Sequence, residues 1–515
     1  MKKSQTFLQG SVILIASVLI TKAVGALFKL PLVNILGGTL MGIFSCAYSI
    51  FIPVYSVCTI GLSTAVCKLI AENEYDNKYI LKSSLALFTL IGLVFSALLF
   101  IFNKEIAYII GSTNSAGSIK FIAPAIFFGC ITSVYRGYFE GLKDMTPTAV
   151  SNVIEGIIKL IFGLGFAIYL PKHFNVNPAE GAIIGITLSC LAGMIYLWIL
   201  YIFSHKENCK TKKTKHITKR LIAIALPISL TILVTNMTSL IDLFTIIRGL
   251  PVGDNPDFLY GCFAGLAVTL FNLVPTITNM FGKSAFPHIA EAIKCKRNAK
   301  KHIEDVLLST AFIAVPCGVF LYLLSNPILR FLFYNRAAEV SASEQSLAYL
   351  GLSVVFVSLC YPLFLILQAA DKAFLTTEIM FAGVVIKYAL NVILIKEIGI
   401  TGAAISTFAT YFVMCILSYS ALRKYIGISL NLRRIFFAPM YAGVLCAVTV
   451  IISKSVISRF FIFGDSVWDM FLILSGCGIA GGGIYIFAMY LLTNIRYTLT
   501  RNERSLRGSA PKNPF

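Results

Sequence analysis

The feature that most constrains this chain is a series of long apolar runs that continues from one end to the other. A helix needs about 20 apolar residues to cross the hydrocarbon core of a bilayer, and every run is long enough. The runs predict an all-α integral membrane protein with about fourteen transmembrane helices. They lie at roughly Phe7–Leu36, Met41–Ile70, Leu81–Ile101, Ser118–Leu142, Thr146–Leu170, Ala179–Phe203, Ile217–Ile247, Phe258–Phe281, Asp305–Ser325, Gln345–Ala369, Phe374–Ile395, Ile400–Leu422, Ile435–Ser453 and Trp468–Thr493.

The composition excludes an ordinary soluble protein. Of the 515 residues, 57% are hydrophobic and 13% are charged, whereas soluble domains are about 45–50% apolar and about 25% charged. The net charge of +20 would suit a nucleic-acid partner, but the cations lie between the apolar runs, as they do in membrane proteins. We therefore expect no nucleic-acid partner. Lys2 and Lys3 precede the first run as in a signal peptide, but we interpret this run as the first membrane helix.

Lys and Arg residues are concentrated in alternate connections between the runs. With the N-terminus placed inside, the inside connections hold about four times as many cations as the outside ones. This bias predicts a multi-pass protein of the cytoplasmic membrane with both termini in the cytoplasm. The largest groups of Lys and Arg in the inside connections lie at 206–220, 294–301, 423–434 and 496–512.

The sequence repeats itself weakly after about 220 residues, which indicates a duplicated six-helix unit. The matching pairs are Gly42 with Gly261, Phe44 with Phe263, Gly181 with Gly402, and Lys159 with Lys387. Two lobes in the same orientation would be related by an axis along the membrane normal, with the substrate path between them. The predicted domains are an N-terminal six-helix lobe (1–204), a basic cytoplasmic linker (205–219), a C-terminal six-helix lobe (220–424), helices thirteen and fourteen (425–495) and a cytoplasmic tail (496–515).

Motifs for common enzyme chemistries do not occur in the sequence. There is no P-loop, no nucleophile elbow, and no His or Cys spacing that is typical of a metal site. The thirteen Cys are scattered and are expected to be small buried hydrophobic residues. We expect no cofactor, no metal and no enzymatic activity. The glycine run from Gly476 to Gly483 is expected to let helices pack closely.

Ionisable residues inside the spans are costly, so each is a candidate for function. Lys22 and Lys29 lie on one face of the first helix, and the other cationic candidates for substrate binding are Lys68, Arg136, Lys159 and Lys283. Lys68 and Lys283 lie near helix ends, where a Lys can also extend toward the membrane surface. The excess of Lys and Arg among the charged residues inside the spans suits a phosphate or diphosphate ligand.

Three of the acidic residues in the spans are candidates as well. Glu140 lies four residues after Arg136, and Glu155 lies four residues before Lys159, so we expect structural ion pairs within each helix. Asp242 has no partner nearby in the sequence, and it is the candidate for coupling transport to an ion.

Two segments of the sequence resemble a known family. Thr21–Leu32, followed by Ile35-Leu36-Gly37 and Gly42-Ile43-Phe44, is similar to the stage V sporulation protein B family. So are Tyr138–Ala149 and Val153-Ile154-Glu155, and the resemblance extends over essentially the whole chain. That family belongs to the multidrug/oligosaccharidyl-lipid/polysaccharide exporter superfamily. The resemblance implies two six-helix lobes with two added helices, and export or flipping of a lipid-linked sugar.

The resemblance also implies roles for particular residues. In relatives that flip lipid II, basic residues of the first helix line a central cavity, and Lys22 matches the first of these positions. Lys29 lies one residue beyond the second, where Phe28 stands here, and the basic position of the second helix has no clear counterpart. Helices thirteen and fourteen would form a groove for a polyprenyl tail.

The resulting hypothesis is a monomeric flippase. It would move an undecaprenyl-diphosphate-linked sugar, lipid II or a related cell-wall or spore-cortex precursor, across the membrane by alternating access, with surrounding lipids as its other partners. The energy would come from the membrane potential or from Na⁺ or H⁺. The alternatives are a multidrug cation antiporter of the same superfamily, which needs an acidic cavity, and a non-transporting scaffold of the cell-wall machinery.

Overall fold

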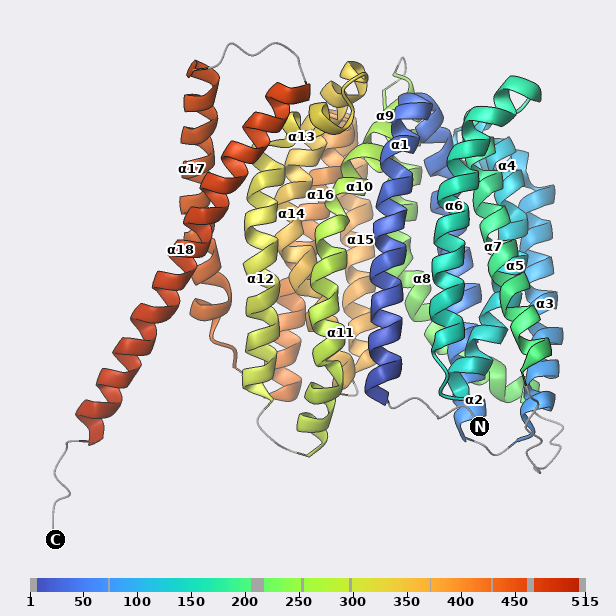
Figure 1. Ribbon diagram of the computed structural model, residues 1–515, viewed down its shortest axis with the longest axis horizontal. Helices are drawn as coiled ribbons and strands as arrows, with labels where there is room; N and C mark the ends of the chain where they lie inside the picture. Colours follow the sequence, from blue (N-terminus) through green and yellow to red (C-terminus); the bar gives the residue numbers. More distant parts are fainter. Residues whose placement is uncertain are drawn as a thin grey trace, which may run out of the picture. The chain divides into compact units, whose positions relative to one another are not determined.

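The computed structural model describes residues 7–72, 75–204, 217–251, 254–295, 299–370, 372–427, 429–460 and 467–508. In this part of the chain, thirteen helices are long and apolar enough to cross a membrane. The prediction of an all-α membrane protein is confirmed (Figure 1). Most of the predicted basic linker, residues 205–216, lies outside the described residues.

The chain forms two compact units. The first contains residues 1–269 and 380–406, and the second contains residues 270–379 and 407–515. The predicted domain boundaries stay a prediction. The helices are α1 (Phe7–Ser56), α2 (Leu62–Glu72), α3 (Asn77–Ile101), α4 (Asn103–Ile110), α5 (Ala116–Gly141), α6 (Thr146–His173), α7 (Pro178–Phe203), α8 (Ile217–Gly249), α9 (Pro256–Tyr260), α10 (Val268–Phe271), α11 (Leu273–Lys294), α12 (Lys300–Leu323), α13 (Ser325–Leu332), α14 (Ala337–Ala369), α15 (Ala373–Ile398), α16 (Ile400–Ala421), α17 (Ala438–Phe460) and α18 (Val467–Gly508).

The first two predicted spans form one continuous but kinked helical segment, Ala16–Glu72, and this explains why thirteen helices accommodate fourteen predicted spans. The break lies at Gly37, whose φ of 69° is in the left-handed region that favours glycine. A short π-helix, Val57–Gly61, then joins α1 to α2. The predicted loop between the two spans is therefore a glycine kink.

Two short helices were not predicted, and they correspond to each other in the repeat. Helices α4 and α13 both contain eight residues, and each follows the third span of its half. Ser325, where α13 begins, lies 222 residues after Asn103, where α4 begins. This spacing agrees with the repeat that the sequence predicts.

The glycine pairs of the repeat occupy corresponding positions. A side chain at Gly181 would overlap the backbone of Phe166 on α6, and one at Gly402 would come within 2.5 Å of the carbonyl carbon of Leu394 on α15. Phe166 and Leu394 each lie seven residues after the matched lysines, Lys159 and Lys387. In both halves, therefore, the sixth span begins against the backbone of the fifth.

Gly42 and Gly261 form a second such pair, and they contact each other. A β-carbon on Gly261 would lie 2.6 Å from the backbone nitrogen of Gly42, and one on Gly42 would overlap the backbone carbonyl of Asp257. Gly42 lies on α1, and Gly261 begins a π-helix, Gly261–Ala267, that follows α9. The absence of side chains lets these two backbones touch.

The glycine run on α18 packs on one side only. A β-carbon on Gly476 or Gly481 would meet Ile457 or Val450 of α17 at 2.8 Å and 2.6 Å. A β-carbon on Gly478, Gly482 or Gly483 would meet open space. Close packing is therefore confirmed for two of these glycines, and α17 and α18 lie side by side in the second unit (Figure 1).

Substituting Gly402 tests the close approach of α16 to α15. Gly402→Ala is expected to destabilise the protein by about 1–3 kcal/mol, since its β-carbon would collide with backbone that cannot rotate away. The measurement is thermal unfolding of the purified protein in detergent. Gly483→Ala is the control and should be neutral or stabilising, because its β-carbon meets nothing. Equal effects of the two variants would contradict the packing described here.

Candidate functional site

Lysines from two helices of the first unit meet around one tyrosine. Lys29 of α1 places its Nζ 5.6 Å from the centroid of the Tyr48 ring, and Lys159 of α6 places its Nζ 5.8 Å from the same centroid. The Lys159 Nζ also lies 5.1 Å from the centroid of the Phe28 ring. Lys29 donates a hydrogen bond to Thr269 Oγ1 at 3.3 Å. Distances of this kind are typical of cation–π contacts.

Lys22 completes what we call the lysine cluster (Lys22, Lys29 and Lys159). Its side chain is exposed, two turns before Lys29, and its charge acts on both Lys29 and Tyr48. Among the described residues, none of these three lysines forms a salt bridge with a carboxylate. Three positively charged side chains from α1 and α6 therefore lie in membrane-spanning helices, where a charge is costly.

An aromatic stripe on α1 positions this cluster. Phe44, Tyr48, Phe51 and Tyr55 recur every three or four residues, and this spacing places them on one face of the helix. Their successive ring centroids are 5.6, 6.1 and 4.8 Å apart. The stripe thus packs the Tyr48 ring, over which both ammonium groups lie.

The predicted ion pairs within helices are wrong in their partners. Arg136 Nη2 lies 2.7 Å from Glu155 Oε1, so the pair joins α5 to α6. Arg136 also donates to Ser151 Oγ at 2.8 Å, and Glu140 accepts a hydrogen bond from Thr148 Oγ1 at 3.0 Å. The partner of Arg136 therefore comes from the facing helix α6 and not from its own helix.

The other predicted substrate residues are both exposed. The side chain of Lys68 is exposed on α2. Lys283 is exposed on α11, which belongs to the second unit. Their roles stay predictions.

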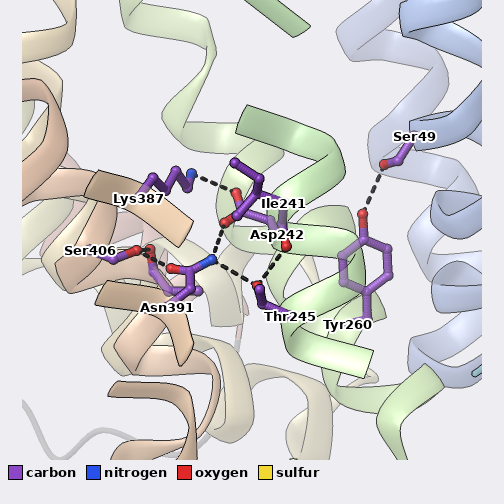
Figure 2. Close-up of polar contacts among 9 residues, drawn as sticks. Ser49, Ile241, Asp242, Thr245, Tyr260, Lys387, Asn391 and Ser406 are labelled. Carbon is purple, nitrogen blue, oxygen red and sulfur yellow. Dashed lines mark hydrogen bonds and ion pairs between the residues drawn. The ribbon is translucent and has the colours of Figure 1, made fainter. Parts of the chain in front are cut away.

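Asp242 lies in a network of hydrogen bonds that the sequence did not indicate (Figure 2). Its Oδ2 lies 2.7 Å from the Nζ of Lys387, and its Oδ1 accepts a hydrogen bond from Asn391 Nδ2 at 3.0 Å. Asn391 also donates to Thr245 Oγ1 at 2.8 Å and accepts from Ser406 Oγ. Asp242 is thus paired with the lysine that matches Lys159 in the repeat, and we call this group the Asp242 network.

Sequence reasoning missed several of these residues. Tyr48 could have been found from the aromatic spacing on α1, which places it on one helix face with Phe44 and Phe51. Asn391 lies one turn after Lys387, but an asparagine carries no special signal by itself. In the part of the chain that the structure describes, no three His, Cys, Asp or Glu side chains form a group able to hold a metal ion.

The fold and these charged groups define an all-helical membrane transporter with a cationic site inside its spans. The chain belongs to the polysaccharide biosynthesis protein family, whose model matches residues 7–293. Among curated relatives, stage V sporulation protein B of Bacillus subtilis (strain 168) is 24% identical over 488 residues, which cover 90% of this chain and 91% of that protein. The lipid II flippase MurJ of the same organism is 23% identical over 535 residues, covering 97% of each chain.

Solved structures show the same fold. The lipid II flippase MurJ in an inward closed conformation has a TM-score of 0.73 at 16% identity, covering 94% of this chain and all of that one (100%). An inward-facing multidrug resistance MATE family transporter of the MOP superfamily has a TM-score of 0.64 at 14% identity, covering 80% of this chain and 98% of that one. The predicted resemblance to stage V sporulation protein B is confirmed, and the shared fold agrees with the predicted superfamily.

The Arg136–Glu155 pair can be tested by a double-mutant cycle. Arg136→Ala and Glu155→Ala are each expected to destabilise the protein by about 3–5 kcal/mol, because each leaves a buried charge without its partner. The double variant should lose less unfolding free energy than the two single variants lose together, with a coupling energy of roughly 1–3 kcal/mol. Glu140→Ala is the control, and its loss of one hydrogen bond to a carboxylate should cost about 1.5–3 kcal/mol, less than the loss of either partner of the ion pair. Unfolding in detergent measures all four, and additive losses would contradict the pairing.

Proposed function

We propose that this protein is a flippase that moves an undecaprenyl-diphosphate-linked sugar, such as lipid II or a related cell-wall or spore-cortex precursor, to the outer leaflet of the cytoplasmic membrane. The observation that carries the proposal is the lysine cluster. Three ammonium groups within a membrane span, with no carboxylate salt bridge among the described residues, require a counter-charge. A diphosphate supplies it.

Lys29 and Lys159 would bind the diphosphate from two helices. Their ammonium groups lie 5.6 and 5.8 Å from the centre of the same tyrosine ring, and we propose that one diphosphate contacts both. Each ammonium carries three donors, and hydrogen bonds from charged donors to phosphate are strong. Lys22, which is more exposed, would attract the anion as it approaches. Binding also relieves the mutual repulsion of the three lysines, and the free energy so gained favours an anion over a cation.

The second unit offers a place for an apolar tail. A cavity of about 530 Å³ lies between α11, α12 and α18, and it is lined mainly by apolar side chains, among them Phe281, Phe312, Ile486 and Met489. Of the two helices that the resemblance implies for the polyprenyl groove, α18 lines this cavity, whereas α17 contributes none of its described lining residues. We propose that the lipid tail occupies this cavity.

The proposed mechanism is alternating access by a monomer. The two predicted six-helix lobes would rock to expose the site to each side of the membrane in turn. With both termini in the cytoplasm, outward movement of an anion is assisted by an inside-negative potential, by about 2.3 kcal/mol per charge per 100 mV. An ion gradient is the alternative energy source, for which Asp242 is the candidate site.

The decisive experiment is flipping in proteoliposomes that contain labelled undecaprenyl-diphosphate sugar. The double variant Lys22→Ala/Lys29→Ala and the single variant Lys159→Ala are expected to slow flipping by about tenfold or more, because a hydrogen bond to a charged group is worth about 1.5–3 kcal/mol. The measurement is the initial rate at low substrate density with an imposed inside-negative potential.

Lys172→Ala is the matched control, since Lys172 is exposed near the end of the same helix as Lys159. It should flip at the wild-type rate. Wild-type protein that is folded but flips nothing would overturn the proposal and favour drug–cation antiport. Flipping that survives neutralisation of all three lysines would remove the cluster from the substrate site.

A further inference from the structure

The Asp242 network uses both oxygens of a carboxylate that lies inside the membrane. The Asp242 and Lys387 side chains are 13% and 4% exposed, so water solvates neither charge well. Lys387 contacts one carboxylate oxygen and Asn391 contacts the other. Each oxygen of the Asp242 carboxylate therefore has a partner within the protein.

The remaining groups of the network are satisfied in the same way. Both amide hydrogens of Asn391 have acceptors, Asp242 Oδ1 and Thr245 Oγ1, and its carbonyl accepts from Ser406. Thr245 in turn donates to the backbone carbonyl of Ile241 at 2.5 Å. Figure 2 shows Lys387 and Asn391 on one side of Asp242, with Thr245 one turn further along α8.

The oxygens gathered here are of the kind that a small hard cation prefers. They comprise one carboxylate, one amide carbonyl and two hydroxyl groups, contributed by α8, α15 and α16. Carboxylate, carbonyl and hydroxyl oxygens are the usual ligands of such cations in proteins. The positive charge at this position, however, is an ammonium group that is covalently attached to α15.

We propose that Lys387 is a tethered counter-cation, which permanently occupies the place at Asp242 that an exchangeable monovalent cation would take. Asp242 then does not bind Na⁺ in this chain, and transport does not draw on a sodium gradient at this residue. The proposal concerns energy coupling, and it holds whichever substrate the protein moves.

The repeat strengthens this assignment. Lys159, the matched lysine of the first half, lies on two aromatic rings and forms no carboxylate salt bridge among the described residues. Lys387 lies 2.7 Å from a carboxylate instead. The two matched lysines therefore have different tasks: Lys159 is available to an external anion, and Lys387 neutralises an internal one.

The test needs no transport assay. The purified full chain is unfolded by heat in increasing sodium chloride, which replaces choline chloride at constant ionic strength. A cation that binds only the folded state raises the Tm as its concentration rises. Wild-type protein is expected to show no sodium-specific shift. A saturable shift that Asp242→Asn abolishes would overturn the proposal.

Lys387→Met supplies the converse measurement. Removing the ammonium leaves Asp242 without its counter-charge, so the Tm should fall in choline and recover by roughly a few degrees as sodium binds in its place. Lys387→Met/Asp242→Asn should show no sodium effect. Lys159→Met is the matched control and should gain no sodium response.

A Lys387→Met protein that folds but does not respond to sodium would overturn the idea that Lys387 replaces a cation. If Lys387→Met does not fold, binding of radioactive ²²Na⁺ to wild-type protein and to Asp242→Asn decides the matter. Sodium bound by the wild type and lost in the variant would refute the proposal, and no binding by either would support it. A failed flipping assay would leave these outcomes unchanged.

Discussion

A charge within a bilayer must find a partner inside the protein, and this requirement organises the interior of the first unit. The backbone meets the same requirement by forming helices, since water cannot satisfy its polar groups there. Glu155 meets it through Arg136, and Asp242 meets it through Lys387. In both cases the ion pair joins neighbouring helices, so that neutralisation and packing are the same interaction.

Against this background the lysine cluster is an exception. Lys29 and Lys159 lie against the Tyr48 ring, whose electron-rich face attracts a cation but does not neutralise it. Such a partner is weaker than a carboxylate, and it can be displaced by an anion that enters from outside. The sign of this local charge favours the proposed lipid-diphosphate ligand over an organic cation. The fold alone does not decide between them, since a lipid II flippase and a multidrug resistance transporter share it.

The sequence was sufficient for the spans but not for the contacts between them. Apolar runs predict helices because a bilayer allows few other structures, so the long helices follow directly from the runs. Helices α4 and α13 were missed because eight residues are too few for a membrane-crossing run. The partner of Arg136 was missed for a different reason: spacing along one helix shows i,i+4 neighbours, whereas Glu155 lies on the next helix. Asp242 likewise has its partner 145 residues away.

The duplication explains how one fold can hold both kinds of lysine. Equivalent positions in the two halves share a backbone environment, as the contacts of Gly181 and Gly402 show. What differs is the helix that faces each lysine: α1 presents aromatic rings to Lys159, and α8 presents Asp242 to Lys387. If Lys387 is tethered to Asp242 as we propose, the charge that crosses the membrane in each cycle belongs to the substrate and not to sodium at this site. An outward-moving diphosphate then needs no sodium gradient, because the membrane potential acts on its negative charge directly.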